Sequence, residues 1–533
     1  MIPVAQPLTG EPADPPPETD AHRVARTGLR RPALQAAVVA GIMLCLLMGA
    51  LDNFVVLTAL PNILADLSAP SGGQTFIVSA YLISSTVAVP IFAKLSDLMD
   101  RKGVLISGLL VFIGGSILAG FSQSFGELVF FRAVQGFGSG DFFPVGIAIV
   151  AVIFPPETRA RVTGLLSGVF GIATVAGPLL GAAIVDHTTW RWVFYVNIPV
   201  GLAGLGLLLA ALGPMRPEKK GSFDFPGAAL LVGWVGSLMF ALVEVSEGGW
   251  AWTDPRAVVL LVSAVILVAI FGWWETSRAR DPLVPLLLLR RRIVAACGGT
   301  TFLVGVTLFP LATFLTLFIS EVTLAGGGNV ADTVRDVLYF LVIPLVFGAA
   351  IAGNLLTRVA YRPVVLVGLG ISSIGLVFLM GLGVSSPTWK LAYGFFPVGG
   401  VVAPLIPIGF GVGMTFPVFL LAVQNQVPEA EVGAASGLVQ FLQSLGGSIG
   451  LTLISSYLQL RITALVPAPP AGGCLSGPPS SACLAWFSAA RMATATAFDE
   501  VFTILLVLSV VGFLLGLTIS GRLPKGRKPT PGA

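Results

Sequence analysis

The chain has 533 residues, of which 55% are hydrophobic and only 11% are charged, and its mean hydropathy is +0.92. A soluble protein carries roughly 25% charged residues, so this composition excludes a soluble globular protein and predicts an exterior that faces lipid. The net charge of +4 does not indicate nucleic-acid binding, because membrane proteins gather Lys and Arg in their cytoplasmic loops.

Residues 1–32 form a polar, proline-rich segment without an apolar run. We expect a disordered cytoplasmic tail there and no cleavable signal peptide.

Beyond this tail, apolar runs of about 20 residues recur, and each is long enough to cross a hydrocarbon core about 30 Å thick. The sequence therefore predicts an all-α polytopic membrane protein with fourteen spans. They are expected at residues 34–60, 74–93, 103–121, 125–153, 162–185, 193–212, 225–245, 257–274, 293–319, 332–356, 364–382, 401–423, 433–460 and 498–520. Residues 389–411 are apolar but contain three prolines, so we expect an irregular approach to the twelfth span.

An even number of crossings puts both termini on the same side of the membrane. If that side is the cytoplasm, most of the 30 Lys and Arg residues fall in cytoplasmic loops, as the positive-inside rule requires. We therefore expect a multi-pass protein of the inner or plasma membrane with both termini in the cytoplasm.

Basic loops at residues 216–220 and 278–292 divide the spans into groups of six, two and six. Two six-helix halves that rock about a central cavity are a common architecture of secondary transporters. The predicted parts are a cytoplasmic tail (1–32), an N-terminal six-helix bundle (33–213), basic linkers with two additional transmembrane helices (214–292), a C-terminal six-helix bundle (293–521) and a second cytoplasmic tail (522–533).

The loop between the second and third spans, residues 93–102, reads AKLSDLMDRK. A short basic loop holds the cytoplasmic ends of two helices together, and a carboxylate in it can bind an arginine or a helix N-terminus. The loop resembles the loop motif of the major facilitator superfamily, although Ala93 and Asp100 stand where that family has glycine. The resemblance implies that Asp97, Arg101 and Lys102 form a conformational loop. The alternative is an ordinary basic loop.

Two charged residues are expected to meet inside the membrane. Arg132 lies roughly 10 Å and Asp52 roughly 12 Å below the outer ends of their spans, at 1.5 Å per residue, and an arginine at such a depth almost always has a partner. One interpretation is a structural ion pair. We favour a working pair, in which Asp52 alternates between a proton and Arg132 or a cationic substrate. The segment around Asp52, LDNFVVLTALPNI, resembles the first-span signature of the fourteen-helix drug:proton antiporters.

The fourth span carries a second acid, Asp141, near the middle of the membrane. A carboxylate at that depth is a functional candidate. Nine residues separate it from Arg132, which on a regular helix places the two on opposite faces. Two interpretations stay open, a second protonation site and a packed acid that is permanently protonated.

The fifth span contains Gly177, Pro178 and Gly181, in a segment that resembles the antiporter motif of the superfamily. Small residues permit close helix contact, and the proline removes a backbone donor. Residues 190–199, WRWVFYVNIP, match the segment that opens the sixth span in the fourteen-helix branch. With these motifs in order over the first two hundred residues, the chain resembles the EmrB/QacA-like multidrug exporters.

Neutral polar residues also recur within the spans. Ser436, Gln440 and Gln443 form one stripe on the thirteenth span, at spacings that share a helix face. Such a stripe either binds neighbouring helices or lines a cavity. We expect a substrate cavity bordered by this stripe together with Asn53 and Gln135.

Cys474 and Cys483 share a loop rich in proline and glycine. They are expected to form a disulfide if that loop faces an oxidising compartment, and to be two free thiols otherwise. The sequence shows no metal-ligand spacing, phosphate loop or nucleophile motif, so we expect no enzyme, no metal and no cofactor.

The resemblance implies a secondary active transporter that exports hydrophobic or cationic small molecules by proton antiport. Its partners would be a small amphiphilic substrate, protons and membrane lipid, with no nucleic acid, and it would act as a monomer. The alternative is an exporter or flippase of an endogenous lipid, glycolipid or siderophore, which the scarcity of deep acids in the second half suggests.

Overall fold

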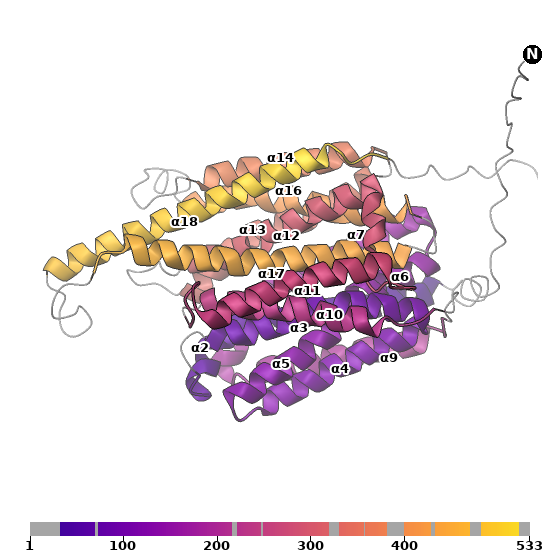
Figure 1. The fold of residues 1–533 in the computed structure, drawn as a ribbon, viewed down its shortest axis with the longest axis horizontal. Helices are drawn as coiled ribbons and strands as arrows, with labels where there is room; N and C mark the ends of the chain where they lie inside the picture. The colour runs from indigo at the N-terminus through magenta and orange to yellow at the C-terminus, as the bar shows by residue number, and fades with distance from the viewer. Residues whose placement is uncertain are drawn as a thin grey trace, which may run out of the picture.

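The computed structural model describes residues 32–69, 73–215, 221–246, 249–318, 330–356, 358–380, 399–427, 432–468 and 481–521. Within these ranges every regular element is a helix (Figure 1). The N-terminal half contains α2 Pro32–Asp66, α3 Gly73–Leu98, α4 Arg101–Phe121, α5 Phe125–Ser139, α6 Phe142–Ile153, α7 Pro156–His187, α8 Trp192–Tyr195 and α9 Asn197–Ala211. The linker helices are α10 Phe225–Ser246 and α11 Pro255–Ser277, followed by a short 3-10 turn, Leu286–Arg290. The C-terminal half contains α12 Arg292–Phe318, α13 Val330–Leu355, α14 Tyr361–Leu379, α16 Gly399–Gln424, α17 Val432–Leu465 and α18 Ser481–Gly516.

Twelve spans in the described part of the chain are long and apolar enough to cross a membrane. One of them combines α5 and α6, and another combines α8 and α9. The helices α7 and α13, of 32 and 26 residues, stand outside that set of twelve. The all-helical membrane architecture expected from the apolar runs is therefore present.

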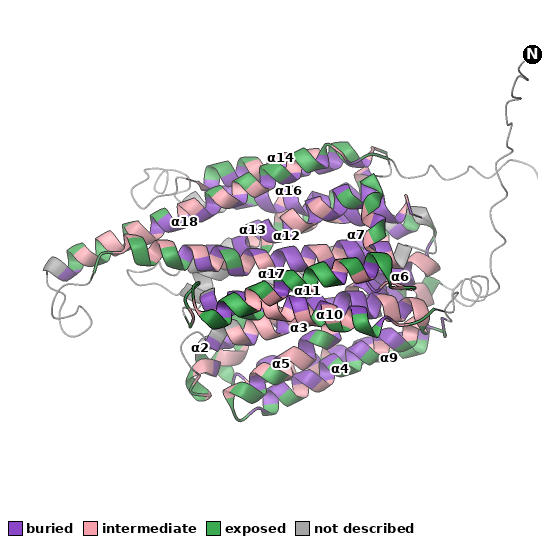
Figure 2. Cartoon of the chain, viewed as in Figure 1, coloured by how far each residue is buried: buried purple, intermediate pink, exposed green. Residues whose placement is uncertain are grey.

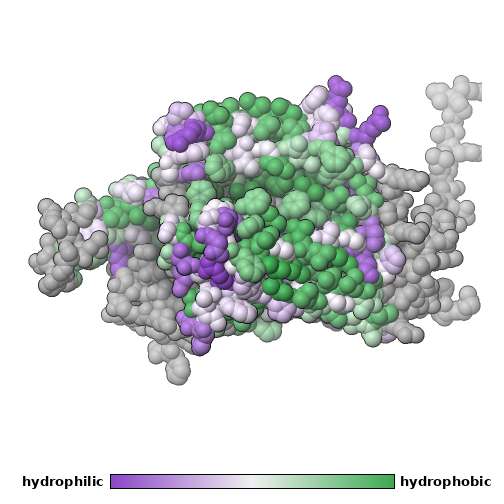
Figure 3. Space-filling view, turned by 90° about the horizontal axis from the view of Figure 1, so that it is seen from below, coloured by the Kyte–Doolittle hydropathy of each residue, from purple (hydrophilic) through white to green (hydrophobic). Residues whose placement is uncertain are grey.

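The outer surface separates apolar from polar residues. Figure 3 shows a broad apolar band with hydrophilic residues gathered at the two ends of the molecule. A belt of this kind matches the hydrocarbon layer of a bilayer with its two aqueous borders.

Two expectations about helix boundaries were wrong. Of the segment 389–411, residues 389–398 lie outside the described residues. Residues 399–411 belong to α16, which continues through Pro404, Pro407 and Pro417, because packing against neighbouring helices compensates for the donors that proline lacks. The last span was expected from residue 498, whereas α18 begins at Ser481. Its first turns are rich in alanine, the strongest helix former, and project beyond the other helices in Figure 1.

The two halves meet along two pairs of helices. On one side α7 contacts α13 and α16, and on the other α3 contacts α17, which also packs against α6. The linker helix α10 lies along the second seam, where it contacts both α3 and α17. Its partner α11 is peripheral, since only 17% of that span is buried compared with 78% in α16, and exposed residues run along it in Figure 2.

The core of the C-terminal half depends on close contact between α13 and α16. A Cβ atom at Gly413 would lie 2.0 Å from the carbonyl oxygen of Leu345, so only glycine permits this approach. By contrast, a Cβ atom at Gly114 on α4 would meet nothing within 4 Å.

We predict that Gly413→Ala destabilises the protein by about 1–3 kcal/mol, the usual cost of overpacking a core. Gly114→Ala is the matched control and should unfold at the same temperature as the unmodified chain or higher, because alanine favours the helix. Thermal unfolding of the purified full chain in detergent measures both. Equal midpoints for the two variants would contradict the tight contact between α13 and α16.

Candidate functional site

A buried ion pair joins α2 to α5. Arg132 of α5 donates from its guanidinium to Oδ2 of Asp52 on α2, and their side chains are 1% and 0% exposed. The depth argument therefore predicted the right partner for this arginine. Removing two opposite charges from water in this way requires that each has further polar contacts.

Three other side chains complete a polar cluster around Asp52. Oδ1 of Asp52 accepts hydrogen bonds of 2.8 Å from the side-chain amides of Gln135 and Asn197. Both amides also donate to Oγ of Ser116, at 2.5 and 3.2 Å. The Asp52 cluster, defined as Asp52, Ser116, Arg132, Gln135 and Asn197, thus ties together α2, α4, α5 and α9.

The guanidinium of Arg132 has contacts beyond Asp52. It donates to Oε1 of Gln135 at 2.7 Å and to the carbonyl oxygen of Ile77 at 3.4 Å, and its carbon lies 4.3 Å from the centre of the Tyr81 ring. The carboxylate of Asp52 thus has one cation and two amide donors around it. A proton on Asp52 would remove the charge that holds Arg132, while these remaining contacts would still accommodate the cation.

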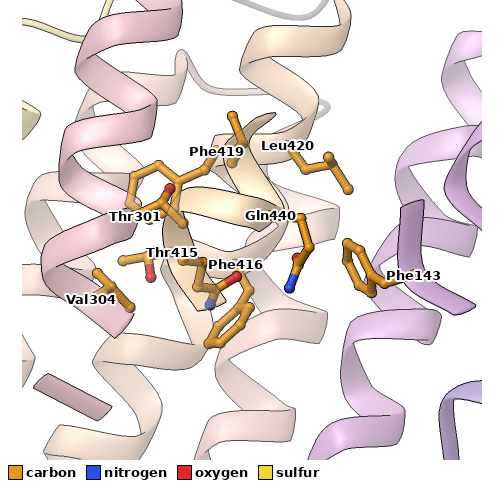
Figure 4. Close-up of a pocket in the computed structure, with 10 residues that line it drawn as sticks. Phe143, Thr301, Val304, Thr415, Phe416, Phe419, Leu420 and Gln440 are labelled. Carbon is orange, nitrogen blue, oxygen red and sulfur yellow. The ribbon is translucent and has the colours of Figure 1, made fainter. Parts of the chain in front are cut away.

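A cavity lies between the two halves, separate from the Asp52 cluster. Its volume is about 20 Å³, which is room for about one water molecule, and Figure 4 shows Phe143 of α6 facing Gln440 of α17 across it. Its other lining residues come from the C-terminal half and are Thr301, Val304, Thr415, Phe416, Phe419, Leu420, Val439 and Gln443. No charged side chain occurs among these described lining residues.

Of the five expected cavity residues, two line the cavity, one belongs to the Asp52 cluster and two lie in neither place. Gln440 and Gln443 line the cavity, whereas Gln135 belongs to the Asp52 cluster. Ser436 is buried and accepts a 3.2 Å hydrogen bond from Gln424. Asn53 donates to the carbonyl of Gly49 on its own helix. Of the described parts of the chain, neither Asn53 nor Ser436 contributes to the cavity wall.

Asp141 stands at a break in the fourth span, between α5 and α6. Its side chain is fully buried, and neither carboxyl oxygen has a hydrogen-bond partner within the described residues. It does not join the Asp52 cluster, as its position nine residues from Arg132 predicted.

The loop at residues 93–102, expected to act in the conformational change, links three helices at one end of the N-terminal half. Asp97 lies 3.8 Å from Arg101, and Nζ of Lys102 donates to the carbonyl of Leu209, at the end of α9, at 3.2 Å. Asp100, which replaces the family's glycine, accepts from the amide of Met215 beyond α9. The substituted residue therefore adds a contact between α4 and the segment that follows α9.

The motif of the fifth span brings α7 close to α2. A Cβ atom at Gly177 would lie 2.3 Å from Cβ of Phe54, and one at Gly181 would lie 1.9 Å from Oγ1 of Thr58. The backbone of Pro178 lies within α7, but its side chain is outside the described set. The two glycines thus permit direct contact with the helix that carries Asp52.

The cysteines fall into two groups. Cys45 and Cys297 are buried free thiols. Cys483 takes part in a disulfide bond, while Cys474 lies outside the described residues, so the expected pairing stays a prediction. No group of three His, Cys, Asp or Glu side chains that could hold a metal ion occurs in the described ranges.

Sequence reasoning missed Ser116, Asn197 and Tyr81. Asn197 lies inside the segment 190–199 that was singled out as a motif, so a buried partner for Asp52 was within reach there. Ser116 and Tyr81 carry no such signal.

We predict that the two charges of the Asp52 cluster depend on each other for stability. Arg132→Leu should cost roughly 3–5 kcal/mol of unfolding free energy, because it leaves a buried carboxylate without its cation. The double variant Asp52→Asn/Arg132→Leu should cost less than the sum of the two single variants, with a coupling of about 0.5–3 kcal/mol. Denaturant unfolding of the four proteins in detergent gives the coupling, and strictly additive costs would contradict the pairing.

Comparisons with known proteins agree with this architecture. Residues 42–451 match the family model of the Major Facilitator Superfamily. Multidrug resistance protein 3 of Bacillus subtilis is 33% identical over 420 residues, which are 79% of this chain and 78% of that protein. Multidrug transporter protein MdtP of the same organism is 30% identical over 428 residues, 80% of this chain and 75% of that protein. The structure of the proton:xylose symporter XylE has the same fold, with a TM-score of 0.59 and 13% identity over 90% of this chain and 94% of that one. The relatives and the fold are those of transporters, which are generally not enzymes. This chain is a multi-pass membrane protein that belongs to the major facilitator superfamily.

Proposed function

We propose that this protein exports small lipophilic molecules across the cell membrane in exchange for protons, by alternating access between its two halves. The observation that carries the proposal is the ionisable pair of the Asp52 cluster, Asp52 and Arg132, which is held inside the N-terminal half away from water. Ionisable residues at membrane depth mark proton relays in pumps and transporters. The names of the two Bacillus relatives support a drug as cargo.

The proposed cycle alternates Asp52 between Arg132 and a proton. When Asp52 is ionised, its contacts fasten α2, α5 and α9 to one another. Protonation weakens them and favours the second arrangement of the two halves. Cargo that binds one arrangement better than the other shifts the same equilibrium, so cargo and proton are coupled by linkage.

The packing of α7 and α13 supports membership of the fourteen-helix branch. We infer that α7 and α13 also cross the membrane, because α7 lies against α2 and α13 against α16, both of which are spans. With these two helices the proposed count is fourteen crossings, and the distribution of Lys and Arg then favours termini in the cytoplasm. The division into two six-helix bundles and a linker pair follows from the same count.

The cavity between the halves marks the proposed cargo site. Because its volume is about 20 Å³ in this conformation, it has to widen in the other arrangement of the halves before a drug-sized molecule enters. Phenylalanines and aliphatic side chains supply most of its wall, and two threonines and two glutamines supply hydrogen-bonding groups. This lining suits a neutral or weakly charged aromatic molecule. A lipid, glycolipid or siderophore is not favoured, since the named relatives are multidrug proteins.

Ethidium, an aromatic cation, is the test cargo. We predict that Asp52→Asn reduces the proton release driven by ethidium to the background level, because asparagine cannot take up the proton. The protein should still insert into the membrane. Asp66→Asn is the matched control on the same helix. Asp66 is half-exposed and pairs with Arg191 at 2.8 Å beyond the apolar span, so its loss should leave the exchange intact. Proton release from proteoliposomes, followed with a pH-sensitive dye, measures both. Exchange that survives Asp52→Asn would remove this acid from the mechanism.

We predict that Gln440→Glu shifts cargo preference toward cations. A carboxylate beside Phe143 and Phe416 would attract a positive charge in a site of low polarity. The apparent affinity for ethidium should rise by about tenfold or more, which corresponds to 1.4 kcal/mol, while neutral cargo gains nothing. Gln426→Glu is the control. This half-buried residue after α16 donates to the carbonyl of Ser520 at 2.7 Å and does not line the cavity. Unchanged affinity at position 440 would place the cargo elsewhere.

A further inference from the structure

Asp141 occupies a slot that a glycine leaves open. A Cβ atom at Gly108 of α4 would lie 2.1 Å from Oδ2 and 2.6 Å from Oδ1 of Asp141. The carboxyl group therefore fills the space of a missing side chain on the neighbouring helix. Burial is complete, and neither oxygen has a hydrogen-bond partner in the part of the chain that the structure describes.

An unpaired carboxylate in such a place is strongly disfavoured. Moving an isolated charge out of water costs tens of kcal/mol in a medium of low dielectric, so the group takes up a proton instead. The elements packed against the junction of α5 and α6 are α2, α3, α4, α7 and α17. Cys45 of α2 is a buried free thiol. Other ionisable side chains on these helices have partners of their own, among them Asp52, Tyr81, Lys94, Lys102 and Arg159.

The two deep acids of the N-terminal half have different surroundings in the same conformation. Asp52 faces a guanidinium and two amide donors. Asp141 faces the backbone at Gly108, and its oxygens have no hydrogen-bond partner among the described residues. Nine residues, about 14 Å along a helix, separate Asp141 from Arg132, so the two acids belong to different sites.

The break in the span connects Asp141 to the cargo cavity. The helix α5 ends at Ser139, and α6 begins at Phe142, directly after the acid. The ring of Phe142 packs against Phe112 with centroids 5.4 Å apart, and the next residue, Phe143, forms the cavity wall opposite Gln440. A movement of the junction therefore moves a residue of the cavity.

We propose that Asp141 is a second proton-carrying residue of the exchange, neutral in this conformation, and that its ionisation shifts the junction of α5 and α6 and with it Phe143. The carboxylate that forms on proton loss needs water or a cation, so it must leave the dry slot beside Gly108. Proton release from Asp141 is thereby tied to the conformational change rather than to contact with cargo. This inference rests on the proposed exchange.

The charge state is tested by infrared spectroscopy of the full chain in lipid. The carbonyl stretch of a protonated carboxyl should be present at neutral pH in the unmodified chain and in Asp52→Asn, and should be lost in Asp141→Asn. Asparagine has the shape of the neutral acid, so Asp141→Asn is expected to fold. Gly108→Ala should displace the acid and shift the same band. If the Asp141→Asn protein fails to insert into the membrane, Asp141→Ala replaces it in the same infrared measurement. A band that Asp141→Asn or Asp141→Ala leaves unchanged would overturn the inference.

The transport role is tested by ethidium-driven proton release in proteoliposomes. Asp141→Asn should lose part or all of the proton release and its pH dependence, whereas Ser139→Ala, two residues away, should not. If Asp141→Asn loses the band but releases protons like the unmodified chain, the acid is only packed and the inference fails, even if Asp52→Asn abolishes exchange. If Asp141→Asn abolishes exchange and Asp52→Asn does not, the inference stands and the proposed role of Asp52 fails.

Discussion

A guanidinium group enclosed by helices inside a bilayer must have an anion beside it, and this requirement organises the N-terminal half. Arg132 and Asp52 are almost completely buried, so each is tolerated only because the other is present. The amides of Gln135 and Asn197 then satisfy the second carboxylate oxygen. These few polar atoms hold four spans, which contain α2, α4, α5 and α9, in fixed positions relative to one another.

The separation of the buried acids from the proposed cargo cavity has a mechanistic consequence. The cavity between the halves has a neutral lining, while Asp52 and Asp141 lie within the N-terminal helices. Direct competition of cargo and proton for one carboxylate therefore has no support in this conformation. Coupling through helix movement is the simpler account, because Phe143 is adjacent in sequence to the packed Phe142 and within two residues of Asp141.

The fold and the central pair were predictable from the sequence for a simple reason. The lengths of apolar runs and the constant rise of a helix determine depth, and depth alone matched Asp52 with Arg132. The partners Ser116 and Asn197 were not predictable, because the rotation of α4 and α9 about their axes decides which faces turn inward. The low helix propensity of proline also gave a wrong prediction at Pro404 and Pro407. There the contacts of α16 with α13 and α14 keep the helix continuous.

The linker helix α10 touches α3 of one half and α17 of the other. An element that lies across the boundary of two moving bodies must slip along at least one of them in every cycle. In the proposed cycle, the contacts of α10 with both halves therefore have to change. Substitutions on α10 are thus a route to altering the turnover rate without replacing Asp52, Asp141 or a residue of the cavity wall.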